Sequence, residues 1–123
     1  MKLGNDIIEI GRIRQAIEKS SSFQERVYTP HEIEYCKSRN KGCYESFAGI
    51  YAAKEAFIKA LGTGMRYGSW QDIEIYHDEW GAPLIRLQDT FKDIYETSGY
   101  TYIHVSISHC KEYAMSTVIL EGA

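Results

Sequence analysis

Two carboxylates lie where the neighbouring residues make a charged group unusual or chemically useful. Asp6 falls within an apolar stretch near the N-terminus, and a carboxylate beside an apolar face needs hydrogen-bond donors, a cation or a metal. Backbone N–H groups or Arg12 could satisfy it equally well. Glu55 lies on a predicted helix one turn before Lys59, a spacing that is more often a surface ion pair. Together the two carboxylates could hold Mg²⁺, which takes one or two protein carboxylates and fills its other positions with phosphate oxygens and water.

Two glycines, Gly62 and Gly64, follow the same predicted helix. Glycine lets a backbone approach a ligand closely, and its N–H group can then meet a phosphate oxygen. A helix C-cap followed by a turn explains the pair equally well. The segment is not a P-loop, because the lysine of that motif follows the glycines, whereas Lys54 and Lys59 precede them here.

A polar strand face near the C-terminus offers hydroxyl groups and a histidine. Ser106 and Ser108 alternate with apolar residues, and His109 opens the following turn. Ligand-contacting hydroxyls beside a strand-end histidine and a plain polar strand face fit this spacing about equally well. A serine hydrolase is disfavoured because the sequence has no G-x-S-x-G elbow. A Cys–His nucleophile is disfavoured too, since His109 and Cys110 would point to opposite faces of a strand.

Length and composition limit the class of protein. The 123 residues allow one domain with one core, and the apolar and charged shares, 44% and 25%, are those of a globular protein. The 14 lysines and arginines against 17 acidic residues give a net charge of −3, which disfavours general nucleic-acid binding. No apolar run reaches the ~20 residues of a membrane span, and Asp6 comes too early for a secretory signal. Three cysteines without a CxxC pair indicate free thiols, so we expect a cytoplasmic protein. From the net charge and the short apolar runs we expect neither nucleic-acid nor membrane partners.

The first half of the chain predicts one strand followed by three helices. These elements are expected at residues 2–10, 12–19, 29–38 and 44–61. The strand is rich in β-branched residues and is expected to be buried on both faces. A loop is expected at the three serines of residues 20–22. Thr29 and Glu32 form a capping box at the start of the third element, and Gly62 ends the longest helix.

The second half changes from a helical period to alternation. Strands are expected at residues 72–76, 83–87, 101–108 and 113–120, and a helix at residues 89–99. The element order is therefore β-α-α-α-β-β-α-β-β. This order predicts an α+β fold in a single domain, residues 1–123, with a mostly antiparallel sheet packed on the long helix.

The sequence resembles the holo-acyl-carrier-protein synthases, the short, stand-alone group of 4′-phosphopantetheinyl transferases. The similar segments, which occur in order, are residues 4–13, 26–33, 52–64, 72–75, 81–83 and 105–109. The most specific features are the early Asp6 and the Lys-Glu-Ala helix with its Gly-Thr-Gly end. The resemblance extends from about residue 3 to residue 120, and it implies the phosphopantetheinyl transferase fold.

The resemblance also implies an activity. Such enzymes transfer 4′-phosphopantetheine from coenzyme A to a serine hydroxyl of an apo acyl carrier protein and release adenosine 3′,5′-bisphosphate. Asp6 and Glu55 would hold Mg²⁺ against the pyrophosphate of coenzyme A, with Lys59 as the third catalytic residue. Glu55 or a metal-bound water would help to deprotonate the attacking serine. The residues expected to bind the cofactor are Lys54, Lys59, Gly62, Gly64, Pro83, Ser108 and His109.

The partners implied by the resemblance are an acyl carrier protein, coenzyme A and further copies of the chain. Members of the family form homotrimers with sites at the subunit interfaces, so Pro83 and its neighbours could serve an adjacent site. Acyl carrier proteins, which act in fatty-acid biosynthesis, are acidic and require a local cationic patch. Arg12, Arg14 and Arg26 are the candidates for this patch.

Two positions depart from the family pattern. Ile50 stands where the family usually has a basic residue, which puts one contact to a coenzyme A phosphate in doubt. Ser22 replaces another frequent basic residue beside the carrier-protein patch. A coenzyme A-binding module of the same fold without efficient transfer is therefore the alternative function. A Mg²⁺-dependent nucleotide pyrophosphate hydrolase would need more clustered carboxylates than this sequence offers.

Overall fold

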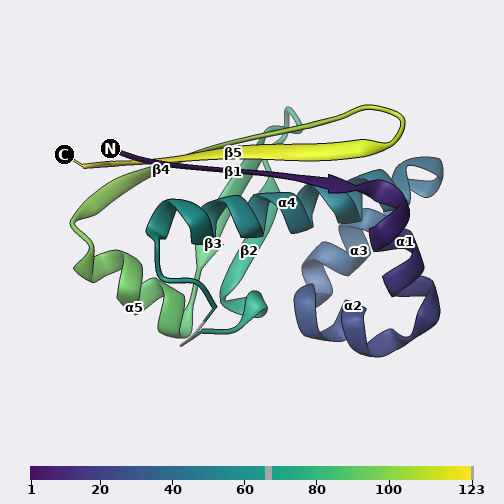
Figure 1. Ribbon diagram of the computed structural model, residues 1–123, viewed down its shortest axis with the longest axis horizontal. Helices are drawn as coiled ribbons and strands as arrows, with labels where there is room; N and C mark the ends of the chain where they lie inside the picture. Colours follow the sequence, from purple (N-terminus) through teal and green to yellow (C-terminus); the bar gives the residue numbers. More distant parts are fainter. Residues whose placement is uncertain (66–67, 123) are drawn as a thin grey trace.

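One long helix and a three-stranded sheet form the centre of this computed structural model, in which residues 1–65 and 68–122 are described (Figure 1). The strands are β1 (Lys2–Glu9), β2 (Ile73–His77), β3 (Pro83–Leu87), β4 (Tyr100–His109) and β5 (Tyr113–Gly122). The helices are α1 (Ile10–Lys19), α2 (Ser21–Val27), α3 (Pro30–Ser38), α4 (Cys43–Leu61) and α5 (Asp89–Thr97). The predicted α+β class is confirmed.

The larger sheet has the strand order β1-β5-β4, and both strand pairs are antiparallel. β2 and β3 form a separate antiparallel hairpin. α4 runs along one face of the larger sheet, while α1, α2 and α3 gather near the N-terminal end of α4 (Figure 1). This arrangement matches the expectation of an antiparallel sheet packed on the long helix.

The close packing of β1 on α4 depends on small residues at the crossing. A Cβ atom built on Gly4 would lie 2.0 Å from the carbonyl oxygen of Ala56 and 2.5 Å from the backbone nitrogen of Ala60. Only glycine fits at such a distance, because no backbone atom can move aside cheaply. The buried residues of α4 include several alanines, whose small side chains let another backbone approach the helix closely. As a result, β1 lies directly against the helix that carries Glu55.

A buried ion pair joins α3, α4 and β2. The Nζ atom of Lys54 lies 2.7 Å from Oε1 of Glu32, and both side chains are fully buried. Lys54 also donates to the backbone oxygens of Val27 at 2.6 Å and Trp70 at 3.1 Å. Glu32 accepts from the backbone nitrogen of Ile75 at 2.7 Å. Because both charges are compensated in this way, the pair can remain in the core.

The loop expected at residues 20–22 is wrong, because helix α2 begins at Ser21. Ser21 and Ser22 lie in its first turn. Serine has a low helix propensity, because its hydroxyl can form hydrogen bonds with nearby backbone groups in non-helical conformations. Val27, at the other end, is 1% exposed, and the Phe23 ring contacts the rings of Tyr28 and Tyr51 at centroid distances of 6.2 Å. Packing against the core therefore overrides the local preference of the serines.

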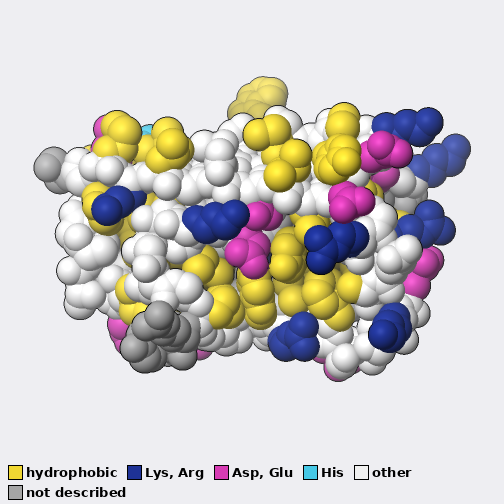
Figure 2. Space-filling model, viewed as in Figure 1, with side chains coloured by type: hydrophobic (Ala, Val, Ile, Leu, Met, Phe, Trp, Pro, Cys, Tyr) yellow, Lys and Arg dark blue, Asp and Glu magenta, His cyan; other side chains and the backbone are white. Residues whose placement is uncertain are grey.

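The prediction that the first strand is buried on both faces is also wrong. β1 is an edge strand, and Leu3 and Ile7 are 62% and 63% exposed. Together with Tyr102, Tyr113 and Met115 they form the apolar outer face of the sheet. Figure 2 shows hydrophobic side chains along the border of the molecule where this sheet lies. None of the helices described is long and apolar enough to cross a membrane.

Candidate active site

The structure brings Asp6 and Glu55 together from two elements that are far apart in the sequence. Asp6 lies on β1 and Glu55 in the middle of α4, beside the crossing at Gly4. The Nζ atom of Lys59 lies 3.0 Å from Oδ1 of Asp6. The Tyr51 hydroxyl donates to Oε1 of Glu55 at 3.4 Å. The group thus contains two carboxylates, one ammonium and one phenol.

The electrostatics of this group show that the carboxylates interact. Partial burial raises the pKa of Glu55, the negative charge of Asp6 raises it further, and Lys59 and the Tyr51 hydroxyl act in the opposite direction. The pKa of Tyr51 is also raised, first by burial and then by Glu55 and Asp6. Within residues 1–65 and 68–122, these two negative charges have one ion-paired ammonium, that of Lys59, which leaves the site attractive to a further cation.

The donor set fits a hard divalent cation such as Mg²⁺. Asp6 and Glu55 offer carboxylate oxygens, and Asp6 also lines a pocket of about 320 Å³ together with Lys59 and Met115. Within residues 1–65 and 68–122, no three His, Cys, Asp or Glu side chains form a cluster suited to a metal. A metal here would therefore take two protein ligands, which leaves positions for phosphate oxygens and water, as is common for Mg²⁺.

Three of the residues predicted to bind the cofactor are Lys54, in the middle of α4, and Gly62 and Gly64, which follow the end of α4. Lys54 cannot contact a cofactor, because its side chain is fully buried and its ammonium is occupied by Glu32 and two carbonyl groups. This corrects the expectation drawn for Lys54. Gly62 and Gly64 have φ angles of 84° and 66°, which favour glycine whether or not a ligand is present. Their role in lining the cofactor stays a prediction.

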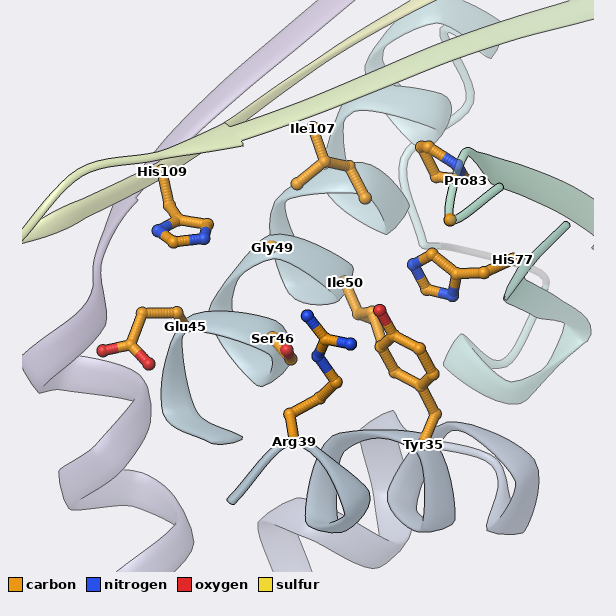
Figure 3. A pocket seen from close by; sticks show the side chains of 11 residues that line it. Tyr35, Arg39, Glu45, Ser46, Gly49, Ile50, His77, Pro83, Ile107 and His109 are labelled. Carbon is orange, nitrogen blue, oxygen red and sulfur yellow. The ribbon is translucent and has the colours of Figure 1, made fainter. Parts of the chain in front are cut away.

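A second pocket, of about 200 Å³, contains other predicted cofactor residues. Pro83 from the β2–β3 hairpin and His109 from the end of β4 line it, together with Ile50 on α4 (Figure 3). Ser108 does not line this pocket. It lies in a shallow apolar hollow with Ile7 and Met115, on the outer face of the sheet. Alternation along β4 places Ser108 on the side of the sheet away from α4, whereas His109, at the end of the strand, lines both the second pocket and this hollow.

The three arginines predicted to meet an acidic partner all lie on α1 and α2 and are exposed. Arg14 pairs with Glu18 at 3.3 Å, and Arg26 lies over the Phe23 ring. Arg12 is close enough to Tyr51 to lower its pKa against the larger effects that raise it. Figure 2 shows Lys and Arg side chains gathered at this end of the molecule. The partner of Asp6 is Lys59, and Arg12 forms no ion pair with it in the described part of the chain.

Several residues of the second pocket were not singled out from the sequence. Tyr35, Arg39, Glu45, Ser46 and His77 all line it. They come from α3, the turn after it, α4 and β2, and no spacing rule links such distant positions.

Comparison with known proteins shows the family to which the chain belongs. The family model of the 4′-phosphopantetheinyl transferase superfamily matches residues 2–118. A holo-[acyl-carrier-protein] synthase of Ruminiclostridium cellulolyticum is 46% identical over 122 residues, which cover 98% of this chain and 91% of that protein.

Solved structures are similar over the same length. The Helicobacter pylori holo-[acyl-carrier-protein] synthase in complex with coenzyme A has a TM-score of 0.85 and 34% identity, covering 97% of this chain and 99% of that chain. The Bacillus anthracis synthase in complex with CoA (3′,5′-ADP) has a TM-score of 0.79 and 36% identity, covering 99% and 96%. Both the sequence and the fold are thus shared over almost the entire chain, including β1 and α4. The chain belongs to the 4′-phosphopantetheinyl transferase superfamily.

Proposed function

We propose that this chain is a holo-acyl-carrier-protein synthase. It transfers 4′-phosphopantetheine from coenzyme A to a serine hydroxyl of an apo acyl carrier protein and releases adenosine 3′,5′-bisphosphate. The observation that carries this proposal is the meeting of Asp6 and Glu55 beside Lys59, in a chain similar to such synthases over nearly its whole length. Fatty-acid biosynthesis in the cytoplasm is the setting that the resemblance implies.

Asp6 and Glu55 would hold Mg²⁺ at the crossing of β1 and α4. When bound, the metal neutralises charge on the pyrophosphate of coenzyme A and stabilises the leaving phosphate. Lys59, which is half exposed, adds a positive charge that can follow the phosphates because its side chain is long and flexible. These residues thus orient the pyrophosphate for attack.

Glu55 is suited to accept the proton of the attacking serine. Its pKa is raised by burial and by Asp6, so its carboxylate is a stronger base than that of an ordinary glutamate. The serine oxygen forms a bond to the β-phosphorus, the bond from that phosphorus to the bridging oxygen breaks, and the serine proton passes to Glu55.

Other predicted residues serve the two partners. Arg12, Arg14 and Arg26 form an exposed cationic surface suited to an acidic carrier protein. The apolar outer face of the sheet supports assembly into a homotrimer, because large apolar patches commonly mark interfaces. In such an assembly Ser108, which lies on that face, would meet a neighbouring subunit.

The test is to incubate the protein with coenzyme A, Mg²⁺ and an apo acyl carrier protein and to measure the mass of the carrier. We expect the gain of one phosphopantetheine, which EDTA abolishes. Asp6→Asn and Glu55→Gln should each lower the rate by about 10²–10⁴-fold. Glu34→Gln, an exposed carboxylate on α3, is the matched control and should be fully active.

Two outcomes would contradict the proposal. No mass change with any apo carrier at saturating Mg²⁺ would overturn transfer, and retained binding of coenzyme A would then favour the binding module. Full activity of both carboxylate variants would overturn the assignment of the site.

A further inference from the structure

A series of three contacts links the Glu55 carboxylate to the core of the molecule. The Tyr51 hydroxyl donates to Oε1 of Glu55 at 3.4 Å, and the two residues are four apart on α4, so they lie on one side of the helix. The Tyr51 ring stacks on Trp70, with centroids 5.4 Å apart and an angle of 28° between the planes. The backbone oxygen of Trp70 accepts from Nζ of Lys54 at 3.1 Å. The series thus returns to α4 at the residue directly before Glu55.

The members of this series are themselves fixed. Lys54 is fully buried, and its ammonium also pairs with Glu32 at 2.7 Å, so the carbonyl of Trp70 is bound to a group with little freedom to move. On its other side the Tyr51 ring contacts Phe23, with centroids 6.2 Å apart and an angle of 34° between the planes. Two aromatic neighbours restrict the rotation of the Tyr51 ring, so its hydroxyl has a defined position.

Glu55 needs such support because Asp6 repels it. The negative charge of Asp6 is close enough to raise the pKa of Glu55, and the ammonium of Lys59 is paired with Asp6. A glutamate side chain has several rotatable bonds, so repulsion would turn an unrestrained carboxylate away from Asp6. The hydrogen bond from Tyr51 opposes this rotation. A carboxylate has about four lone pairs, so one hydrogen bond leaves the others for a cation.

We propose that Tyr51, supported by Trp70 and Lys54, is a positioning residue that holds the Glu55 carboxylate beside Asp6 for a divalent cation. This inference rests on the proposed function, in which the two carboxylates share the metal. It gives the buried Lys54 a role next to the site although its ammonium does not reach the cofactor. The decisive group is the Tyr51 hydroxyl, because phenylalanine would keep the stacking on Trp70 but could not donate.

The test measures metal binding separately from transfer. Binding of Mn²⁺, which prefers oxygen ligands as Mg²⁺ does, is followed on the full chain by electron paramagnetic resonance. Asp6→Asn, which should abolish binding, identifies the site. We expect Tyr51→Phe to weaken Mn²⁺ binding by about 3- to 10-fold, the range of one hydrogen bond. In transfer assays the KM for Mg²⁺ should rise in the same proportion, while the KM for the carrier protein should stay unchanged.

Tyr44→Phe is the matched control. Tyr44 lies on the same helix, and its hydroxyl also donates to a glutamate, Glu18, at 3.4 Å. This variant loses the same kind of hydrogen bond far from Asp6 in the sequence and outside the carboxylate pair. It should bind Mn²⁺ like the unchanged protein.

A double-mutant cycle separates positioning from general packing. Trp70→Leu should weaken Mn²⁺ binding in the unchanged background but add little to Tyr51→Phe, because the indole acts through the Tyr51 hydroxyl. Equal losses from Trp70→Leu in both backgrounds would overturn the series of contacts. Unchanged Mn²⁺ affinity of Tyr51→Phe would overturn the inference, as would a lack of Mn²⁺ binding by the unchanged protein. If that protein binds Mn²⁺ but transfers nothing to any carrier, the proposed function fails, whereas the binding comparison still tests Tyr51.

Discussion

Asp6 and Glu55 illustrate how a functional site can oppose stability at the scale of single residues. Both are partly buried, and each carries a negative charge that disfavours the charge on the other. Lys59 compensates only in part, because it is about half exposed and its pairing with Asp6 is weakened by solvent. We therefore expect the protein to be less stable with Glu55 ionised than with a neutral group there.

The pH dependence of stability tests this expectation. Because folding raises the pKa of Glu55, the folded chain holds this proton more tightly, and stability falls as pH rises from the ordinary glutamate value through the folded value. Glu55→Gln removes that loss. Without divalent cations, the variant should have the higher Tm at pH 7, and the two Tm values should converge towards pH 4. Thermal denaturation followed by circular dichroism measures both.

Added Mg²⁺ provides the second half of this measurement. It should raise the Tm of the unchanged protein, because a ligand that binds only the folded state stabilises it, and should have less effect on Glu55→Gln. A lower Tm for Glu55→Gln at pH 7 would contradict the unfavourable interaction with Asp6. Equal Mg²⁺ effects on both proteins would contradict binding at Glu55.

Lys54 and Lys59 show the limit of residue-level prediction. Both are lysines of the same helix, five residues apart, and the resemblance assigned both to the cofactor. Lys59 is exposed beside Asp6, whereas Lys54 is buried against Glu32. The difference depends on what packs against each side of α4, and α3 and β2 come from distant parts of the sequence.

At the scale of elements, the site depends on how closely β1 approaches α4. Gly4 allows the contact, and Asp6 lies two residues farther along the same face of the strand. Gly62 ends α4 with a left-handed conformation, as its position in the sequence predicted. The capping box at Thr29 and Glu32 was predicted as well and is present at the start of α3.

Gly4→Ala tests the approach of these two elements. The added methyl group would overlap the backbone of Ala56, so β1 must move away from the helix and take Asp6 with it. We expect a loss of about 1–3 kcal/mol in the free energy of unfolding and a marked loss of transfer activity. Urea denaturation and the carrier mass assay measure the two effects.

Gly11→Ala is the control for this substitution. No atom lies within 4 Å of a Cβ built on Gly11, and its φ angle is not in the left-handed range. This variant should keep both stability and activity. If Gly4→Ala behaved in the same way, the close contact would not be what positions Asp6.

At the scale of the whole molecule, α4 separates the two halves of the proposed cofactor site. Ser46 and Glu55 are nine residues apart, which is about two and a half turns and places them on opposite sides of the helix. A cofactor that contacts the Asp6–Glu55 group of one chain would therefore reach the pocket lined by Ser46, Pro83 and His109 in a neighbouring chain more readily than that of its own. The exposed apolar sheet face is the surface on which such neighbours would meet.

Met115→Glu tests the proposed trimer. Met115 is 42% exposed and lies on β5, the middle strand of the sheet, so a charge there would be buried in an interface formed by this face. Sedimentation should show trimers for the unchanged protein and monomers for the variant, with transfer activity lost. Lys92→Glu on α5 is the charge-changing control and should stay trimeric. A monomeric, fully active unchanged protein would contradict shared sites.

The sequence by itself determined the fold class and the helix boundaries at Thr29 and Gly62. Through resemblance to a family, it also predicted that Asp6 and Glu55 act in one site. Caps and alternation depend on neighbouring residues, so they can be recognised locally. Only the tertiary structure decided that Lys54 is buried, that β1 has an open apolar face, that α2 is a helix, and that Arg39 shares a pocket with His109. Each of these depends on contacts between segments distant in the chain, where burial and charge compensation outweigh local preference.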